Sequence, residues 1–414
     1  MRSSTLVVVA TVAIVIILIL STLVVTNAIS IRGLFVAQTT TSTTTVSTVS
    51  ISTVTVNNTL TSSIPTTVTS LATTTSPSVS TVTVTQNYTN TTTVYTAVAA
   101  DPKLVRANGY FLTTPADMMQ WNNSIFSSFV QNLIQSNVTY LYFNLPNVAP
   151  DGSLQDNFTL DSSLILRFYM SANSSGHSFQ YIAWTGTQTD PDAVLGNYTS
   201  SGVNQTVNSV YSAGFGGILL DLEPVPNDSP QFLGMLNAFR SAMNQVDPGM
   251  LLGANSMAVY AGEPAGHEWG WDPNYFQQVT SLLNFTSPML FESGTETESQ
   301  YVQYVVGQIE ATAGDAKCAL IYAIPNWYAN TTWHNPLAEN ISNAVVAFRT
   351  YVDNGDYPPL PASSFLGLAI YGLNKTYTLT PGTQTQALET TPSDWSYFVS
   401  QWVNSNYPTK IESG

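Results

Sequence analysis

Charged side chains are scarce in this chain of 414 residues, because Asp, Glu, Lys and Arg together supply only 8% of it. Basic residues are the rarer kind, with 10 Lys and Arg against 25 Asp and Glu, so the formal net charge is -15. Such an excess of negative charge repels nucleic acid and anionic lipid surfaces. Nucleic acid is therefore excluded as a partner, and so low a content of charge is unusual for a cytosolic protein.

Cysteine is almost absent. Cys318 is the single one, so no intramolecular disulfide can form and stability must come from a large core. It lies in an apolar run, where a small buried hydrophobe is expected rather than a nucleophile. The three histidines, His177, His267 and His334, lack the spacing of zinc ligands, and we expect them in exposed loops. Neither a metal nor another cofactor is expected.

The first 37 residues are predicted to form a transmembrane signal-anchor region. Residues 6–25 are almost wholly apolar and follow Arg2, and about 20 apolar residues suffice to cross a bilayer as a helix. A cleaved signal peptide is the alternative, with residues 26–28 as a poor cleavage site. We expect an uncleaved, single-pass anchor in the cell membrane, with the remainder of the chain extracellular.

Residues 38–100 are dominated by Thr, Ser and Val and carry almost no charge. This composition buries too little large apolar surface to offset the entropy of the chain, and its hydroxyl groups suit glycosylation. Asn-X-Ser/Thr sequons such as Asn57 and Asn87 agree with an outward-facing glycoprotein. A low-complexity stalk is predicted, although the alternation of Thr and Val also allows strands.

From residue 101 to residue 414, short apolar runs alternate with amphipathic stretches, as in repeated βα units. Eight strands are expected, at residues 108–112, 139–143, 179–184, 217–222, 250–254, 288–291, 318–323 and 365–371. The clearest helix follows the fourth strand, where Ser229 can cap it and Pro230 suits its first position. Eight such units predict an α/β fold, the (β/α)₈ or TIM barrel.

Two carboxylates end the fourth of these strands. Side chains alternate along a strand, so Leu219, Asp221 and Glu223 share one face. Reacting groups of such barrels sit at the C-terminal ends of the strands, and a buried acid there is costly unless it is paired or functional. An ion pair is the alternative, but few basic residues are available. Adjacent carboxylates raise each other's proton affinity, which favours a general acid of the glycosidase type.

Aromatic side chains follow several of the same strands, and sugar rings present C–H faces that pack on indole and phenol rings. Each single aromatic could equally be part of the core. Their convergence at one end of the barrel is the stronger indication of a sugar site. The candidates for sugar binding are Trp184, Trp269, Trp271, Trp327, Tyr328 and Tyr371.

Four segments, in order along the chain, are similar to motifs of glycoside hydrolase family 18, which includes chitinases, endo-β-N-acetylglucosaminidases and non-catalytic chitin-binding lectins. The likeness spans about residues 105–402. Residues 217–226 look like the fourth-strand motif Asp-x-x-Asp-x-Asp-x-Glu, of which the last two acids are kept. Residues 289–292 look like the sixth-strand Met-x-Tyr-Asp, residues 323–328 like Gly-x-Pro-x-Tyr, and residues 367–371 like the last strand.

The resemblance implies roles for the two acids. Glu223 would protonate the glycosidic oxygen, while Asp221 would hold the substrate's 2-acetamido group as its carbonyl oxygen attacks the anomeric carbon. Met289, Phe291 and Glu292 would contact the sugar. The expected activity is that of a retaining hydrolase of β-linked N-acetylhexosamine polymers or glycans.

The sequence departs from the family at several of these positions. Leu219 stands where the family has an acid, and Phe291 replaces a Tyr whose hydroxyl donates to the acetamido oxygen. Glu292 replaces Asp, and Tyr371 replaces a Trp that floors the sugar subsite. Tyr322, on the seventh strand, is the residue that could restore a hydroxyl.

Three other functions remain open. A sugar-binding protein on a decayed barrel is one, although the family's lectins typically lose the proton-donating Glu. A glycosidase of another barrel family, such as the family 25 lysozymes, is the second. A structural surface-layer component is the third.

Overall fold

The computed structural model describes residues 56–57, 65–70, 82–87, 93–94, 104–113, 115–155, 163–327, 330–372 and 390–413. The chain divides into two compact units, Met1–Val98 and Ala99–Gly414. The predicted membrane segment, residues 6–25, lies outside the described residues. Within the described ranges, no helix is both long enough and apolar enough to cross a membrane.

The described residues of the N-terminal unit form two antiparallel strand pairs. Strand β2 (Pro65–Ser70) pairs with β3 (Val82–Asn87), and β1 (Val56–Asn57) pairs with β4 (Thr93–Val94). Val68 lies opposite Val84, as expected where β-branched residues favour extended backbone. The alternation of Thr and Val thus forms strands in part of the segment predicted to be a plain stalk.

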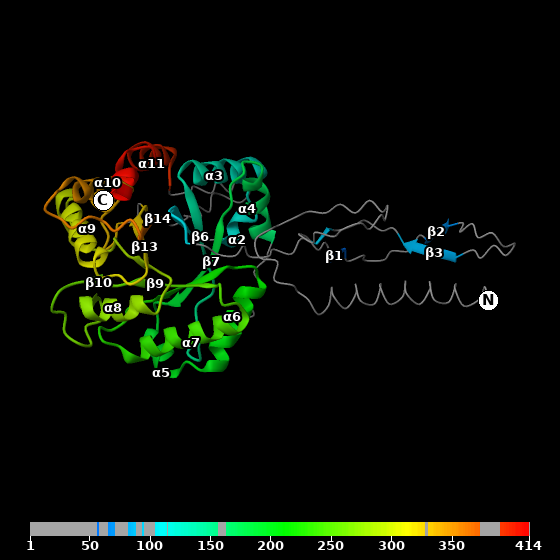
Figure 1. The fold of residues 1–414 in the computed structure, drawn as a ribbon, viewed down its shortest axis with the longest axis horizontal. Coiled ribbons are helices and arrows are strands. Elements are labelled where there is room, and N and C mark those ends of the chain that lie inside the picture. The colour runs from blue at the N-terminus through cyan, green and yellow to red at the C-terminus, as the bar shows by residue number, and fades with distance from the viewer. Residues whose placement is uncertain are drawn as a thin grey trace. The chain divides into compact units, whose positions relative to one another are not determined.

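The C-terminal unit is built on a closed barrel of eight parallel strands, in the order β12-β13-β14-β5-β6-β7-β8-β9. The predicted (β/α)₈ architecture is therefore confirmed (Figure 1). The strands are β5 (Asn108–Leu112), β6 (Val138–Asn144), β7 (Gln180–Thr187), β8 (Gly217–Leu222), β9 (Leu251–Ser256), β12 (Phe285–Pro288), β13 (Ala319–Pro325) and β14 (Phe365–Gly372).

One predicted strand was misplaced. Residues 288–291 were expected to be the sixth strand, but β12 ends at Pro288. Met289 makes only an isolated bridge to Ala323, and the chain then turns at Glu292, whose φ is 55°. The apolar run continues past the strand because Leu290 is fully buried and Phe291 packs against the barrel interior.

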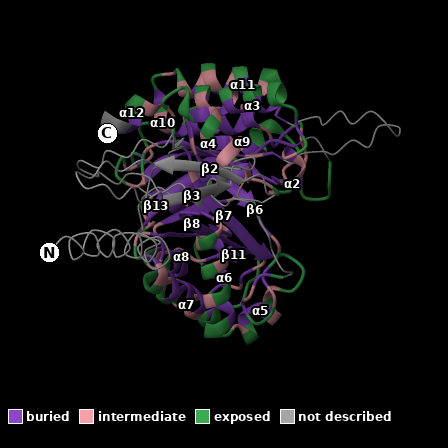
Figure 2. Cartoon of the chain, turned by 90° about the vertical axis from the view of Figure 1, so that its right-hand side faces the viewer, coloured by how far each residue is buried: buried purple, intermediate pink, exposed green. Residues whose placement is uncertain are grey.

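Helices surround the barrel with their inner faces buried and their outer faces exposed (Figure 2). The predicted helix after β8 is confirmed as α7, which Ser229 caps by accepting a 3.2 Å hydrogen bond from the Phe232 amide. The helices are α2 (Pro115–Met118), α3 (Asn123–Gln135), α4 (Ser163–Asn173), α5 (Pro191–Asn197), α6 (Ser200–Ser212), α7 (Pro230–Val246), α8 (Pro273–Ser281), α9 (Glu298–Ala313), α10 (Ile341–Asp353), α11 (Pro392–Phe398), the π-helical turn η1 (Val399–Val403) and α12 (Tyr407–Ser413). A short parallel pair, β10 (Ala258–Val259) and β11 (Gly270–Trp271), lies outside the barrel sheet.

The barrel interior is filled by side chains from alternate strand positions, with bulky aromatics among them. Phe111 and Tyr142 stack with ring centroids 4.5 Å apart, and Phe111 meets Trp184 edge-on at 5.1 Å. Leu219 belongs to the same cluster and is fully buried. Burying each such side chain contributes about 1.5–3 kcal/mol. Because Leu219 is packed in the barrel interior, the next side chains of the same face, those of Asp221 near the end of β8 and Glu223 just after it, lie at the C-terminal end of the barrel.

Candidate active site

Asp221 and Glu223 lie at the C-terminal end of β8 and are buried, with 6% and 5% of their surfaces exposed. Both carboxylate oxygens of Asp221 accept hydrogen bonds. Oδ2 receives the Trp184 indole N–H at 2.7 Å, and Oδ1 receives the Asn255 amide at 2.6 Å. These two donors, from the strands on either side of β8, fix the orientation of the carboxylate.

Gly186 allows the backbone of Asp221 to pack closely against strand β7. The two residues are register partners, and a Cβ on Gly186 would lie only 1.7 Å from the Asp221 carbonyl oxygen. Only glycine fits at this position. The placement of the acid thus depends on a residue without a side chain.

Burial raises the pKa of Glu223 well above its ordinary value of 4.5. The neighbouring charge of Asp221 and the side-chain hydrogen bond between the two acids raise it further, as does the charge of Glu292, while a hydrogen bond from Gln188 acts in the opposite direction. The raised pKa favours the protonated form of Glu223. A protonated carboxyl beside an orienting carboxylate is the arrangement that a general acid requires.

A third acid, Glu292, lines the same cavity from the turn after β12. Its pKa is raised mainly by desolvation in the cavity, with smaller contributions from the charges of Glu339 and Asp221, and His334 partly opposes the shift. Its left-handed backbone, at φ 55°, is uncommon for a residue with a side chain. The turn is held by Glu339, whose Oε2 accepts the Glu292 amide at 2.7 Å.

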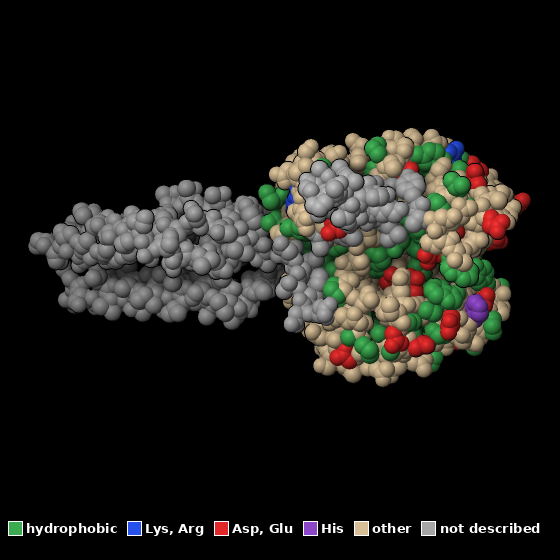
Figure 3. All heavy atoms as spheres, turned by 180° about the vertical axis from the view of Figure 1, so that it is seen from behind, with side chains coloured by type: hydrophobic (Ala, Val, Ile, Leu, Met, Phe, Trp, Pro, Cys, Tyr) green, Lys and Arg blue, Asp and Glu red, His purple; other side chains and the backbone are tan. Residues whose placement is uncertain are grey.

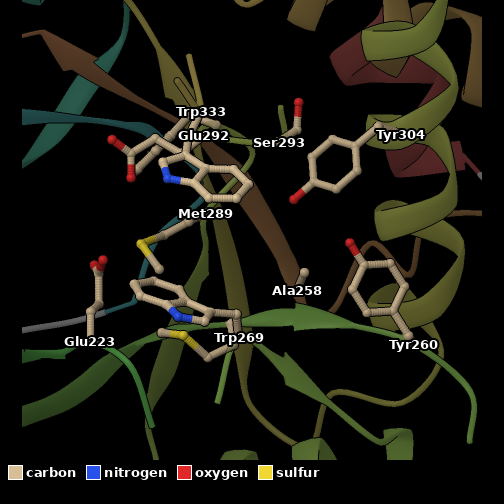
Figure 4. A pocket seen from close by; sticks show the side chains of 11 residues that line it. Glu223, Ala258, Tyr260, Trp269, Met289, Glu292, Ser293, Tyr304 and Trp333 are labelled. Carbon is tan, nitrogen blue, oxygen red and sulfur yellow. The ribbon is translucent and has the colours of Figure 1, made fainter. Parts of the chain in front are cut away.

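Glu223 and Glu292 line a cavity of about 370 Å³, whereas Asp221 lies beside Glu223 and is not among the lining residues. Figure 4 shows Glu223 on one side, Trp269 and Trp333 on either side of Met289, and the hydroxyls of Tyr260 and Tyr304 directed inward from the opposite side. In Figure 3, red acidic and green hydrophobic side chains surround a hollow in the barrel unit. The lining residues are Glu223, Met257, Ala258, Tyr260, Trp269, Met289, Phe291, Glu292, Ser293, Tyr304 and Trp333.

Trp269 and Trp333 remain 54% and 66% exposed. Large aromatic faces left in water at the rim of a cavity are available for stacking against a ligand. Among the described residues that line the cavity there is no Lys, Arg or His. The cavity therefore combines acids, methionines and aromatic faces, which suits an uncharged polyhydroxyl ligand better than an anionic one.

Tyr371 and Phe291 stack with ring centroids 4.8 Å apart and planes inclined by 14°. Trp327 meets both rings edge-on at 5.2 Å. Burial raises the pKa of Tyr371, and the charges of Asp221, Glu223 and Glu292 raise it further. The phenol therefore stays protonated close to all three acids, where it is a hydroxyl donor.

Two of the residues predicted to bind sugar, Trp271 and Tyr322, are not among the residues that line the cavity. Trp271 is fully buried, donates its indole N–H to the Val225 carbonyl at 2.9 Å and packs edge-on against Tyr275. Tyr322 is also fully buried and shares a 2.8 Å hydrogen bond with Thr312 of α9. Alternation along β13 places Ala323 in the barrel and Tyr322 outside it.

Other predicted residues differ in their placement. Trp184 is a buried donor to Asp221 and does not line the cavity. Trp327 is 4% exposed and supports Phe291 and Tyr371. Tyr328 lies outside the described residues. Trp269, Met289, Phe291 and Glu292 do line the cavity with Glu223, while the functions assigned to them remain predictions.

Sequence reasoning missed Tyr260, Tyr304 and Trp333. Trp333 follows the seventh strand, as Trp327 does, and the same criterion of an aromatic in a strand-end loop could have found it. Tyr304 lies on α9 and carried no such signal. His334 was expected in an exposed loop, which was wrong, since it is 1% exposed. Its partner Glu339, five residues further on, explains how an imidazole is buried there.

Among the described residues, no group of three or more His, Cys, Asp or Glu side chains is arranged to hold a metal ion. Cys318 is buried, and burial raises the pKa of its thiol.

No protein family model matches the sequence. No curated protein sequence matches it either. Solved structures with a similar fold include the spore cortex-lytic enzyme SleL of Bacillus megaterium, at 13% identity and a TM-score of 0.46, covering 72% of this chain and 75% of that one. A chitinase from Chromobacterium violaceum is similar at 12% identity and a TM-score of 0.45, and the match covers 72% of this chain and 99% of the chitinase. An endo-1,4-beta-mannanase from Rhizomucor miehei is similar at 10% identity and a TM-score of 0.43, and the match covers 75% of this chain and 96% of the mannanase. These likenesses concern the barrel fold alone.

Proposed function

We propose that this chain is a glycosidase that hydrolyses β-linked N-acetylhexosamine polymers or glycans outside the cell. The observation that carries the proposal is the buried Glu223 carboxyl, with its raised pKa, beside Asp221 at one side of a cavity with exposed tryptophans. Hydrolysis of a glycosidic bond needs an acid near the leaving oxygen and a surface that holds sugar rings. Both requirements are met within one cavity.

In the first step, Glu223 gives its proton to the glycosidic oxygen as the bond from that oxygen to the anomeric carbon breaks. The carbonyl oxygen of the substrate's 2-acetamido group attacks the anomeric carbon from the opposite face and forms a cyclic oxazolinium. In the second step, Glu223, now a carboxylate, takes a proton from water, whose oxygen opens the ring at the anomeric carbon. The sugar keeps its original configuration, and Glu223 regains its proton.

Asp221 orients the acetamido group by accepting its N–H. The carboxylate already accepts from Trp184 and Asn255, but its two oxygens offer about four lone-pair sites. The similarity of the strand-end motifs to glycoside hydrolase family 18 supports this route over one with a covalent enzyme intermediate. Tyr371, whose pKa is raised by burial and by the charges of all three acids, supplies a hydroxyl that Phe291 lacks.

A test compares the full chain with its Glu223→Gln variant on three substrates: chitooligosaccharides, β-1,4-glucan oligosaccharides and peptidoglycan fragments. Cleavage of the N-acetylated chains, lost in the variant, is expected. Cleavage of glucan, which has no acetamido group, would contradict the substrate-assisted step. Binding of chitooligosaccharides by both proteins without any cleavage would replace the enzyme with the alternative, a surface lectin. The lectin alternative is considered because Leu219 and Phe291 depart from the motifs of glycoside hydrolase family 18.

We further propose that residues 6–25 anchor the protein in the cell membrane as a single-pass segment, with residues 38–100 as the spacer to the barrel. The apolar composition of that segment supports the proposal. The full chain should stay with the membrane fraction after washing at alkaline pH, and a variant lacking residues 1–37 should be released. Recovery of the full chain in the soluble fraction would contradict the anchor.

A further inference from the structure

Glu339 is a fully buried carboxylate that no step of the proposed reaction uses. It lies between β13 and α10 and accepts hydrogen bonds from the turn after β12, which is 46 to 47 residues away in sequence. Its Oε2 receives the Glu292 amide at 2.7 Å. Its Oε1 receives the amide and the hydroxyl of Ser293 at 3.0 and 2.6 Å. A buried carboxylate requires donors of this kind.

His334 completes the environment of Glu339. The imidazole is 1% exposed, and its Nδ1 lies 2.9 Å from Glu339 Oε2. Its Nε2 lies 3.1 Å from the Trp327 carbonyl oxygen, and the ring stacks on the Trp327 indole at a centroid distance of 3.9 Å. A carbonyl and a carboxylate both accept hydrogen bonds, so both ring nitrogens donate when the two bonds form together.

The pair joins two loops that each send a side chain into the cavity. The turn after β12 carries Glu292, and the loop after β13 carries Trp333. The Gly294 amide also donates to the Trp333 carbonyl at 2.9 Å, so backbone and side chains connect the same two loops. Glu292 keeps a left-handed backbone with φ 55°, a conformation that persists only where the surroundings impose it.

A purely stabilising ion pair is the competing explanation. Buried charge pairs are weak evidence for stability, because desolvation offsets their attraction. The Glu339 carboxylate also does more than pair with His334, because it accepts three hydrogen bonds from Glu292 and Ser293 in the turn after β12. We propose that Glu339 and His334 are positioning residues that hold the Glu292 carboxyl and the Trp333 indole in the cavity. The consequence for catalysis rests on the proposed function, whereas the positioning itself does not.

The positioning is tested first without substrate, by amide hydrogen exchange of the full chain. Glu339→Gln keeps the size of the side chain but turns one acceptor into a donor that faces other donors. His334→Phe keeps the stacking on Trp327 and removes both hydrogen bonds. Exchange over residues 290–296 should rise at least tenfold in each variant. Glu310→Gln, an exposed change on α9, is the matched control and should leave that segment unchanged. Unchanged exchange in both loop variants would overturn the proposal.

Activity then separates positioning from a general loss of stability through a double-mutant cycle. Glu339→Gln should lower kcat about tenfold in the wild-type background but less than twofold in a Glu292→Gln background, because its effect passes through Glu292. An equal reduction of kcat by Glu339→Gln in the two backgrounds would overturn the proposal. A wild-type protein that cleaves none of the glycans would refute the proposed function, and the exchange measurement would still decide whether Glu339 and His334 fix the turn that carries Glu292.

Discussion

The indole N–H of Trp184 donates to Asp221 Oδ2 at 2.7 Å, across the register of strands β7 and β8. Trp184 is at the same time part of the aromatic interior of the barrel, edge-on to Phe111 and Tyr371. The orientation of the site's carboxylate is thus coupled to the packing of the core. Trp184→Phe removes this N–H together with part of the buried ring system, so a matched Trp→Phe change elsewhere in the core is needed to separate the hydrogen bond from the packing.

Trp184→Phe should lower kcat by roughly 10–100-fold with little change in KM, because Asp221 loses its indole donor. The free energy of unfolding should fall by about 1.5–3 kcal/mol, the usual contribution of a hydrogen bond to a charged group. Trp395→Phe is the matched control, since Trp395 is also buried but its indole nitrogen has no hydrogen-bond partner among the described residues. Equal losses of kcat in the two variants would contradict the role of the bond.

The raised pKa of Glu223 predicts the pH dependence of activity. Activity should fall on the alkaline side as Glu223 loses its proton, because the acid then has nothing to donate. This alkaline fall in the pH profile should be absent from Glu223→Gln, in which only residual activity remains. A fall in activity near the ordinary carboxyl pKa of 4.5, or the same alkaline fall in the residual activity of Glu223→Gln, would contradict the assignment.

The same shift predicts how stability depends on pH. The folded protein keeps a proton that the unfolded chain releases above about 4.5, so the unfolded state binds fewer protons and stability falls as pH rises through the window up to the raised pKa. Each unit of displacement corresponds to about 1.4 kcal/mol. Glu223→Gln removes this cost, so its thermal unfolding midpoint should exceed that of the wild type at neutral pH and match it more closely below pH 4.5. A lower midpoint for the variant at neutral pH would contradict the pKa shift.

The exposed tryptophans at the rim should determine substrate binding. Trp269→Ala and Trp333→Ala should each raise KM about tenfold while kcat changes little, since each removes an aromatic face from the cavity. Leu337→Ala, at an 85% exposed position in the loop that carries Trp333, is the control and should behave as wild type. Steady-state kinetics on chitooligosaccharides of increasing length would measure the effect. Unchanged KM in both tryptophan variants would place the sugar elsewhere.

The role of the Tyr371 hydroxyl can be tested by removing it and then placing a hydroxyl on the neighbouring ring of Phe291. Tyr371→Phe should lower kcat on the order of a hundredfold, as loss of one donor in such a site commonly does. Adding Phe291→Tyr to that variant should restore part of the activity, because the two rings are stacked 4.8 Å apart and Phe291 lines the cavity with Glu223 and Glu292. Failure of Tyr371→Phe to lower kcat would exclude the hydroxyl from the reaction.

The barrel could be predicted because its strands are short apolar runs of the right length, and β8 was predicted with its observed bounds, Gly217–Leu222. The sixth strand was misplaced for the same reason. Leu290 and Phe291 continue an apolar run because they pack at the barrel mouth, and a sequence does not distinguish such a turn from a buried strand.

Within the site, strand alternation was sufficient to place Leu219, Asp221 and Glu223 on one face. The same rule, applied to β13, would have turned Tyr322 outward. Trp269 and Trp271 are only two positions apart, and which of them is exposed depends on how their loop folds against Val225. The burial of His334 could not be predicted, since it depends on a tertiary hydrogen bond to Glu339.

The most direct test of Glu223 as the proton donor compares leaving groups. Wild type and Glu223→Gln would be assayed on an N-acetylated oligosaccharide and on the matching dinitrophenyl glycoside, whose leaving group departs without protonation. The variant should lose about a thousandfold or more of kcat on the natural linkage and far less in the step that releases dinitrophenol. Equal losses on both substrates would contradict Glu223 as the general acid.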